Sequence, residues 1–194
     1  MASSVDICNV AMHRLGQDEI TSLNDNTKRA ALCLTTYPRL LRVMQEEYVW
    51  SWGRKRANLA PNLTAPLFTT DYSFAFTIPS DYMRMESMTD YGTDYLIEGN
   101  TILSNTNPLP IRYVALVQDP NRMSGLFGEA LGLRMAIDMC KLLTGDWGLK
   151  ESIEKDYARV MASARTADAQ SEGEGKVPED TWLSARNDGF TGPI

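Results

Sequence analysis

The stretch YVWSWGRKRANLA, residues 48–60, holds the side chains best suited to chemistry. Trp50 and Trp52 stand directly before three consecutive cations, which are Arg54, Lys55 and Arg56. Bases stack on aromatic rings while cations follow phosphates, so this composition is typical of a groove for single-stranded nucleic acid. Tryptophan beside arginine is also typical of protein interfaces. In a third interpretation, which the spacing favours, Trp50 continues the apolar stripe of the preceding helix and packs in the core.

The sequence contains few of the residue combinations that common enzymes use for catalysis or for metal binding. His13 is the only histidine, and it lies beside Arg14 on the polar side of an expected helix, with no nucleophile to activate. One histidine and three scattered cysteines do not match the usual metal-ligand spacings, and no phosphate-binding glycine loop is present. We therefore expect no catalytic residue, no cofactor and no metal. Two carboxyls that converge only in space could still cleave a glycoside, so a hydrolase remains an alternative.

Composition narrows the class of protein further. The net charge of −6 argues against a chain whose main task is to grip phosphate, because such affinity comes largely from lysine and arginine. Cys8, Cys33 and Cys140 lie in apolar helical patterns, which predicts reduced core thiols and synthesis in a cytoplasm. The opening MASSVDICNV lacks the features of a signal peptide. No run reaches the ~18 apolar residues that a membrane span needs, so we expect no membrane association.

The elements that must position these residues fall into a helical pattern at both ends of the chain. Helical spacing of apolar residues covers about 3–15, 27–48, 124–144 and 149–168. Ser3 and Asp6 have capping-box spacing at the start of the first helix. Pro38 lies inside the second and predicts a kink or a division into two helices. The third opens with Gly125, Gly128 and Gly132, which would let a neighbouring backbone approach closely.

The middle of the chain, about 56–117, has short runs with a period of two instead. The apolar runs YLI and TIL, joined through Gly99 and Asn100, predict a β-hairpin. Residues 171–194 have the composition of a disordered tail, yet contain large apolar side chains suited to anchoring a partner. The predicted fold class is α+β, mainly α. It is a four-helix bundle with a small antiparallel β wing inserted between helices 2 and 3, and an extended C-terminal tail.

In their order along the chain, several segments resemble the head-to-tail adaptor (connector) proteins of tailed bacteriophages, most closely the tail tubular protein A type of short-tailed phages. The resemblance lies in DICNVAMHRLGQDEITSLNDNTKRAALC, YPRLLRVMQEEYVWSWGRKRANLAP, FTIPSDYMRM, YLIEGNTILSN, LPIRYVALVQDP and FGEALGLRMAIDMCKLLTG. The last expected helix, with DYARVMASARTADAQ, and TWLSAR beyond it extend the resemblance over most of the chain. None of these segments is a catalytic signature. The resemblance therefore depends on the order and spacing of the segments along the chain.

The resemblance implies a structural virion protein at the head–tail junction, made in the cytoplasm of a host bacterium. Such adaptors form an oligomeric ring, commonly of twelve copies, between the portal protein and a tail nozzle of the tail tubular protein B type. DNA leaves through the centre of the ring without specific binding. Residues 1–170 would form the adaptor domain of this chain, and residues 171–194 a docking tail.

The resemblance also implies roles for particular residues. Trp182, Leu183, Arg186 and Phe190 would dock against the portal. The β wing, including the Gly99-Asn100 hairpin, would contact the nozzle or adjacent subunits. Trp50 and Trp52 would fix the wing to the helices. Acidic neighbours in the ring would meet the three cations at the root of the wing: Arg54, Lys55 and Arg56.

Two other functions stay open. A virion-associated peptidoglycan hydrolase is the first alternative, because some relatives of the adaptor family have been described as degrading cell walls. A DNA-binding packaging or ejection factor is the second, with Arg54, Lys55 and Arg56 as its phosphate contacts.

Overall fold

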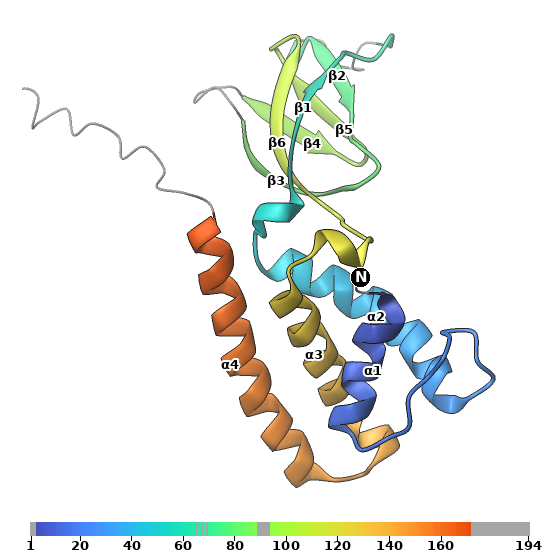
Figure 1. Ribbon diagram of the computed structural model, residues 1–194. Helices are drawn as coiled ribbons and strands as arrows, with labels where there is room; N and C mark the ends of the chain where they lie inside the picture. Colours follow the sequence, from blue (N-terminus) through green and yellow to red (C-terminus); the bar gives the residue numbers. More distant parts are fainter. Residues whose placement is uncertain (1–2, 65, 67, 69, 89–93, 172–194) are drawn as a thin grey trace, which may run out of the picture.

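In the computed structural model the chain forms a helical body and a β region that are stacked end to end (Figure 1). The structure describes residues 3–64, 66, 68, 70–88 and 94–171. The helical body consists of α1 (Ser4–Arg14), α2 (Lys28–Glu47), α3 (Gly125–Leu143) and α4 (Trp147–Ser171). The β region is inserted between α2 and α3. Short 3₁₀ turns stand where the chain enters and leaves it: η1 (Ser51–Gly53) and η2 (Pro120–Arg122).

Local signals explain how α1 begins and why it packs closely. Ser3 Oγ accepts from Asp6 N at 3.1 Å and the Asp6 carboxylate accepts from Ser3 N at 2.8 Å, so the predicted capping box is confirmed. A Cβ on Gly132 of α3 would lie 2.6 Å from Cγ1 of Val10 on α1. The glycine therefore permits the close approach predicted for it, whereas Gly125 has open space around it.

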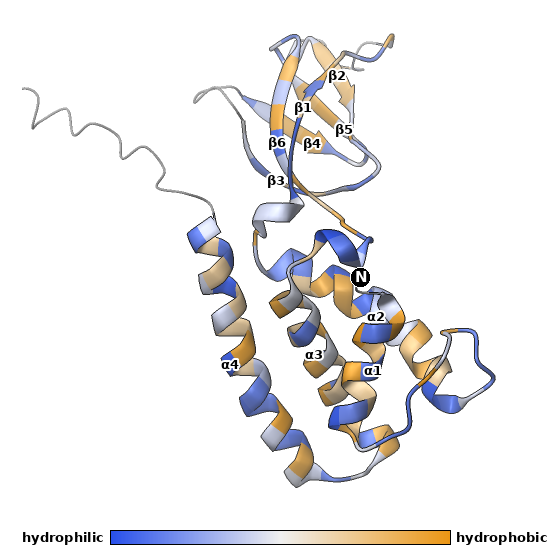
Figure 2. Ribbon diagram, viewed as in Figure 1, coloured by the Kyte–Doolittle hydropathy of each residue, from blue (hydrophilic) through white to orange (hydrophobic). Residues whose placement is uncertain are grey.

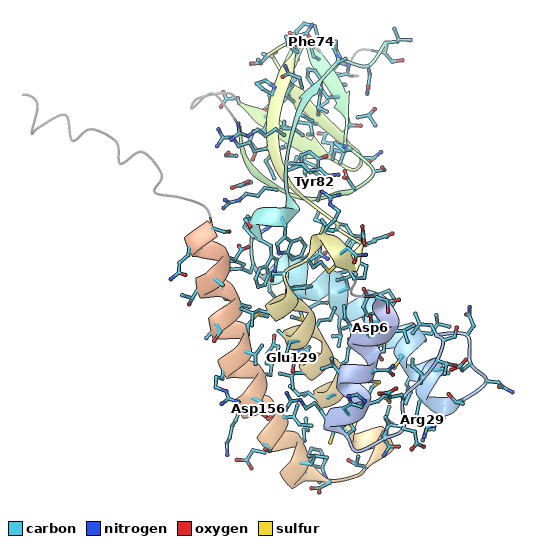
Figure 3. All side chains as sticks on the ribbon, in the orientation of Figure 1. Asp6, Arg29, Phe74, Tyr82, Glu129 and Asp156 are labelled. Atoms are coloured by element: carbon cyan, nitrogen blue, oxygen red, sulfur yellow. The ribbon has the colours of Figure 1, made fainter. Side chains whose placement is uncertain are left out.

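The central helix of the body is α3, which packs against α1, α2 and α4. Its buried side chains belong to the core of the helical body and include Phe127, Ala130, Leu131, Leu133, Met135, Ala136, Met139 and Cys140. Polar side chains join the helices at their surfaces. Arg14 of α1 reaches Glu129 of α3 at 2.9 Å and Asp156 of α4 at 3.7 Å, and Figure 3 labels both acids.

The β region contains two three-stranded antiparallel sheets. The first has the order β1–β6–β3, made of β1 (Arg54–Leu59), β6 (Leu109–Ala115) and β3 (Tyr82–Met88). The second has the order β2–β5–β4, made of β2 (Phe74–Thr77), β5 (Thr101–Ser104) and β4 (Tyr95–Glu98). Figure 2 shows that many of the hydrophobic residues of this region lie on these strands. The sheets enclose a core of their own, formed by Phe76, Ile102, Leu109, Ile111, Tyr113 and Ala115.

The predicted fold class, a four-helix bundle with a small β wing, is wrong. The inserted region is a two-sheet unit with its own hydrophobic core, separate from the core of the helices. The helices gather around α3 instead of forming a bundle of equal partners, since α4 packs mainly on α3. The period-two runs indicated strands, but pairing between β1 and β6, which lie far apart in the chain, decides the number of sheets.

The hairpin expected within the β region is confirmed. β4 and β5 pair antiparallel, with Glu98 opposite Thr101. Gly99, the first residue of the two-residue loop, has φ = 58°, a left-handed conformation that glycine adopts without steric strain. Within α2, Pro38 is part of one continuous helix, so the alternative of two shorter helices is wrong.

Candidate functional site at the junction between the helices and the β region

Trp50 closes the end of the helical body where the chain leaves α2. Its side chain is 1% exposed, and its indole Nε1 donates to the Met44 carbonyl at 3.2 Å. Its ring meets Phe127 of α3 in a T-shaped arrangement with centroids 5.0 Å apart. Tyr48 packs on it in the same way at 4.8 Å. Trp50 therefore lies in the helical core, where no base could stack on it.

Trp52 extends this cluster into the turn η1. Its ring stacks on Trp50 with centroids 5.9 Å apart and meets Phe127 in a T-shaped contact at 5.0 Å. The indole Nε1 of Trp52 is buried and has no hydrogen-bond partner among the described residues. The two tryptophans and Phe127 together join the start of the β region to the central helix.

A buried carboxylate fastens η1 to the end of α4. Asp168 is 6% exposed and accepts hydrogen bonds from the Ser51 backbone N at 3.0 Å and from Ser51 Oγ at 2.7 Å. Ser171 Oγ donates to the Asp168 carbonyl at 2.6 Å and lies 3.4 Å from Ser51 Oγ. The last turn of α4 is thus bound to the first turn of the junction.

A buried amide holds the second chain crossing, where the β region returns to the helices. Gln45 of α2 is 1% exposed. Its Nε2 donates to the Val117 carbonyl at 2.8 Å, and its Oε1 accepts from the Val117 N at 2.9 Å. Neither Gln45 nor Asp168 stood out in the sequence, because a polar residue beside an apolar stripe gives no sign of its partner.

The basic run does not form one patch, because the alternation of β1 sends its members to opposite faces. Lys55 lies on the face that carries Tyr113 and forms an ion pair with Asp81, which also accepts a hydrogen bond from Tyr113 Oη at 3.1 Å. The hydrogen bond from Lys55 holds the pKa of Asp81 below its ordinary value, since it favours the charged form. Burial, with the bond to Asp81, raises the pKa of Tyr113 to about 12. Lys55 thus has its acidic partner within its own chain.

The outer face of sheet β1–β6–β3 gathers arginines from all three strands, and we call it the arginine face. Arg54 and Arg84 both lie opposite Val114, and Arg56 lies directly opposite Arg112. Residues opposite each other in an antiparallel pair project on the same side of the sheet. Arg54 reaches across the sheet to Glu86 at 2.9 Å. Sequence reasoning missed Arg84 and Arg112, because only the strand register brings them beside the basic run.

The second sheet presents an apolar edge. The side chains of β4 are exposed along its whole length, with Tyr95 at 40%, Leu96 at 44% and Ile97 at 40%. Beside it lies a groove of about 420 Å³, and Leu96, Phe68 and Leu103 are among the apolar residues that line it. Gly99 and Asn100 stand at the end of this strand, in the hairpin loop.

The portal-docking residues inferred from the resemblance lie outside the described residues: Trp182, Leu183, Arg186 and Phe190. The described chain ends at Ser171, beside the junction.

The remaining candidates for chemistry are structural in character. His13 lies 2.7 Å from Glu19 at the surface. The three cysteines are buried and form no disulfide with one another, as the reduced-thiol prediction requires. Within the described ranges no three His, Cys, Asp or Glu side chains are grouped to hold a metal. No helix of those ranges has both the length and the apolar content to span a bilayer.

Every described carboxyl group whose pKa departs clearly from its ordinary value has a lowered pKa. Hydrogen bonds lower the pKa of Asp6, Asp25, Asp81 and Asp119. A glycosidase acid needs a raised pKa so that it can donate a proton near neutral pH. These four carboxyls are therefore poor candidates for that role.

No family model matches the sequence, and no curated protein matches it either.

Proposed function

We propose that this protein is a head-to-tail adaptor of a tailed bacteriophage, a structural subunit without catalytic activity. Copies of it would form a ring in the virion that joins the portal to the tail nozzle and surrounds the channel for exiting DNA. The proposal rests on the resemblance of the ordered segments to that family and on the physical character of the junction.

The observation that carries the proposal is the double fastening of the β region to the helices. Where the chain enters the region, the aromatic cluster and Asp168 hold η1. Where it returns, Gln45 holds Val117. A subunit that links two partners must transmit force between its ends, and buried contacts at both crossings resist bending there.

Exposed apolar side chains at two distant places fit contact with two partners. One set lies along β4 in the β region, and the other lies at the far end of the helical body, near the turn between α3 and α4 (Figure 1). At that turn Leu142 is 58% exposed and Trp147 is 63% exposed. Exposed aromatic residues are common among the energetically important contacts of protein interfaces.

Electron microscopy tests the proposal directly. The purified full chain is mixed with portal-bearing heads of the phage that encodes it, and the expected result is a ring at the portal vertex. A matched sample of the chain without residues 172–194 should fold but leave the vertex bare, because that segment holds the proposed docking residues. Absence of the full chain from the vertex would overturn the adaptor proposal. A ring formed by the shortened chain would overturn only the role of the tail.

A further inference from the structure

Three arginines of the arginine face differ from most other cations that the structure describes, because their side chains lack partners. Within the described residues, Arg56, Arg84 and Arg112 make no side-chain ion pair, hydrogen bond or aromatic contact. Among the described cations, Arg122 in η2 is the other one whose side chain makes no such contact. Three such arginines therefore share one face of one small sheet.

The arrangement of these arginines is unfavourable unless an anion is present. Arg56 and Arg112 lie directly opposite each other on paired strands, and like charges in that position repel. Arg112 Nε is buried and has no hydrogen-bond partner, which adds the desolvation penalty of an unsatisfied donor. Among the described residues, Glu86 is the acid that forms an ion pair on this face, and its partner is Arg54. A carboxylate-rich ligand would relieve the repulsion between these charges, because guanidinium groups bind carboxylates bidentately.

The chain itself carries such a ligand. Residues 172–194 contain five acidic side chains and two basic ones. The acidic residues are Glu172, Glu174, Glu179, Asp180 and Asp188. Five acids and two bases give this short segment half of the net charge of −6 that all 194 residues carry. The rest of the chain is therefore much less acidic for its length.

The segment begins next to the face. Ser171, the last described residue, has its hydroxyl 3.4 Å from Ser51, three residues before Arg54. Neighbouring strands are about 4.8 Å apart, so the face is only about 10 Å wide between Arg54 and Arg84. An extended chain advances about 3.3 Å per residue, and the acids of residues 172–180 are therefore within reach. A tether this short gives an effective concentration of about a millimolar or more.

We infer that residues 172–194 bind the arginine face of their own chain, with carboxylates of the segment on the guanidinium groups of Arg56, Arg84 and Arg112. The contact is a property of the isolated protein and does not depend on the adaptor proposal. In an adaptor it would hold the docking segment against the subunit until a portal displaced it. Nucleic acid is the less favoured occupant, because the charge of the whole chain opposes a polyanion from outside.

Paramagnetic relaxation in the isolated full chain tests this inference. A nitroxide is attached to the variant Ser184→Cys, since burial of the three native cysteines should protect them from the label. At low salt and high dilution, amide signals of β1 and β3 around Arg56 and Arg84 should be broadened, and those of α1 should not. Raising the salt should remove the broadening, because ionic contacts at a surface are screened.

The variant Arg56→Gln/Arg84→Gln provides the decisive comparison. It should lose the broadening, and trypsin should release residues 187–194 from it roughly two to ten times faster, as expected for the loss of two exposed ion pairs. The matched control, Arg42→Gln/Lys155→Gln, removes the same charge from the helical body and should behave as the unmodified chain. Unfolding temperatures of both variants check that each is folded.

Three results would overturn the inference. The first is broadening that is absent, lies elsewhere or survives in Arg56→Gln/Arg84→Gln. The second is broadening seen only between labelled and isotope-enriched copies in a mixture, which would assign the segment to a second copy. The third is a short single-stranded DNA that shifts the signals of the arginine face at low micromolar concentration while the label leaves that face untouched, which would make it a nucleic-acid surface.

Discussion

The helical body and sheet β1–β6–β3 differ in whether their cationic side chains have partners. Every arginine and lysine of the four helices has a side-chain partner, whether a carboxylate, a carbonyl or an aromatic ring. Arg14, for example, spans two acids on two other helices. On the arginine face only Arg54 has an acidic partner that the structure describes. The difference teaches that the cations of the helices contact groups of their own fold, whereas the described contacts of the sheet include none from the side chains of Arg56, Arg84 and Arg112.

The largest effect is expected where the helical body is most tightly packed. Replacing Trp50 by Ala should lower the free energy of unfolding by about 3–5 kcal/mol, because a fully buried ring leaves a large cavity. Urea denaturation measures the change. Trp147→Ala is the control, since that ring is 63% exposed and its loss should cost far less. Equal losses in the two variants would contradict the placement of Trp50 in the core.

A smaller loss is expected from the polar fastening of the junction. Asp168→Ala leaves the partly buried Ser51 N and Oγ without their acceptor. An unsatisfied buried group costs about 1–3 kcal/mol, so the loss should lie toward the lower end of that range. The cost should appear in urea denaturation and as faster amide hydrogen exchange at η1. Glu151→Ala, on the exposed side of the same helix, serves as the control. Unchanged exchange at η1 in Asp168→Ala would show that this bond does not hold the junction.

The ion pair of Lys55, the cation of β1 on the opposite face from Arg54 and Arg56, should make the stability of the protein depend on pH. The folded pKa of Asp81 lies below its ordinary value of 3.8, chiefly because of the hydrogen bond from Lys55. Its stabilisation is therefore present above that ordinary value and is lost as the pH falls through the folded pKa. Asp81→Asn should be less stable than the unmodified chain by about 1 kcal/mol at pH 7, and the difference should shrink as the pH falls below 3.8. Denaturation at a series of pH values measures this, and a difference that stays constant as the pH falls would contradict it.

The smallest effects separate the two groups of cations most sharply. Arg14→Gln should lose up to about 1 kcal/mol of stability, because it removes exposed ion pairs. Arg56→Gln should change stability by less than about 0.5 kcal/mol or increase it, since the substitution relieves repulsion from Arg112. Thermal and urea denaturation compare the two. A clear loss in Arg56→Gln would mean that the arginine face stabilises its own sheet after all.

Much of the local structure could be predicted, and the reasons are local. Apolar stripes placed four helices whose ends lie close to the expected positions, as with α2 at Lys28–Glu47. Caps and turns depend on neighbouring residues, so the Ser3 capping box and the Gly99-Asn100 hairpin could be predicted from short stretches. The extent of the β region, predicted as about 56–117, agrees with strands that run from Arg54 to Ala115. Its division into two sheets could not be predicted, because the partner of β1 is a strand some fifty residues further along the chain.

The basic run shows what the amino-acid sequence determines alone and what it does not. Sequence decides that Arg54, Lys55 and Arg56 are adjacent and that Trp50 ends an apolar stripe. Tertiary structure turns Lys55 to Asp81 and places Arg54 and Arg56 beside Arg84 and Arg112. The physical reason is that a strand alternates its side chains between two faces, while the neighbours on each face come from distant segments through register. The alternation within one strand can therefore be read from its sequence, but the residues that share a surface come from several segments and depend on the tertiary structure.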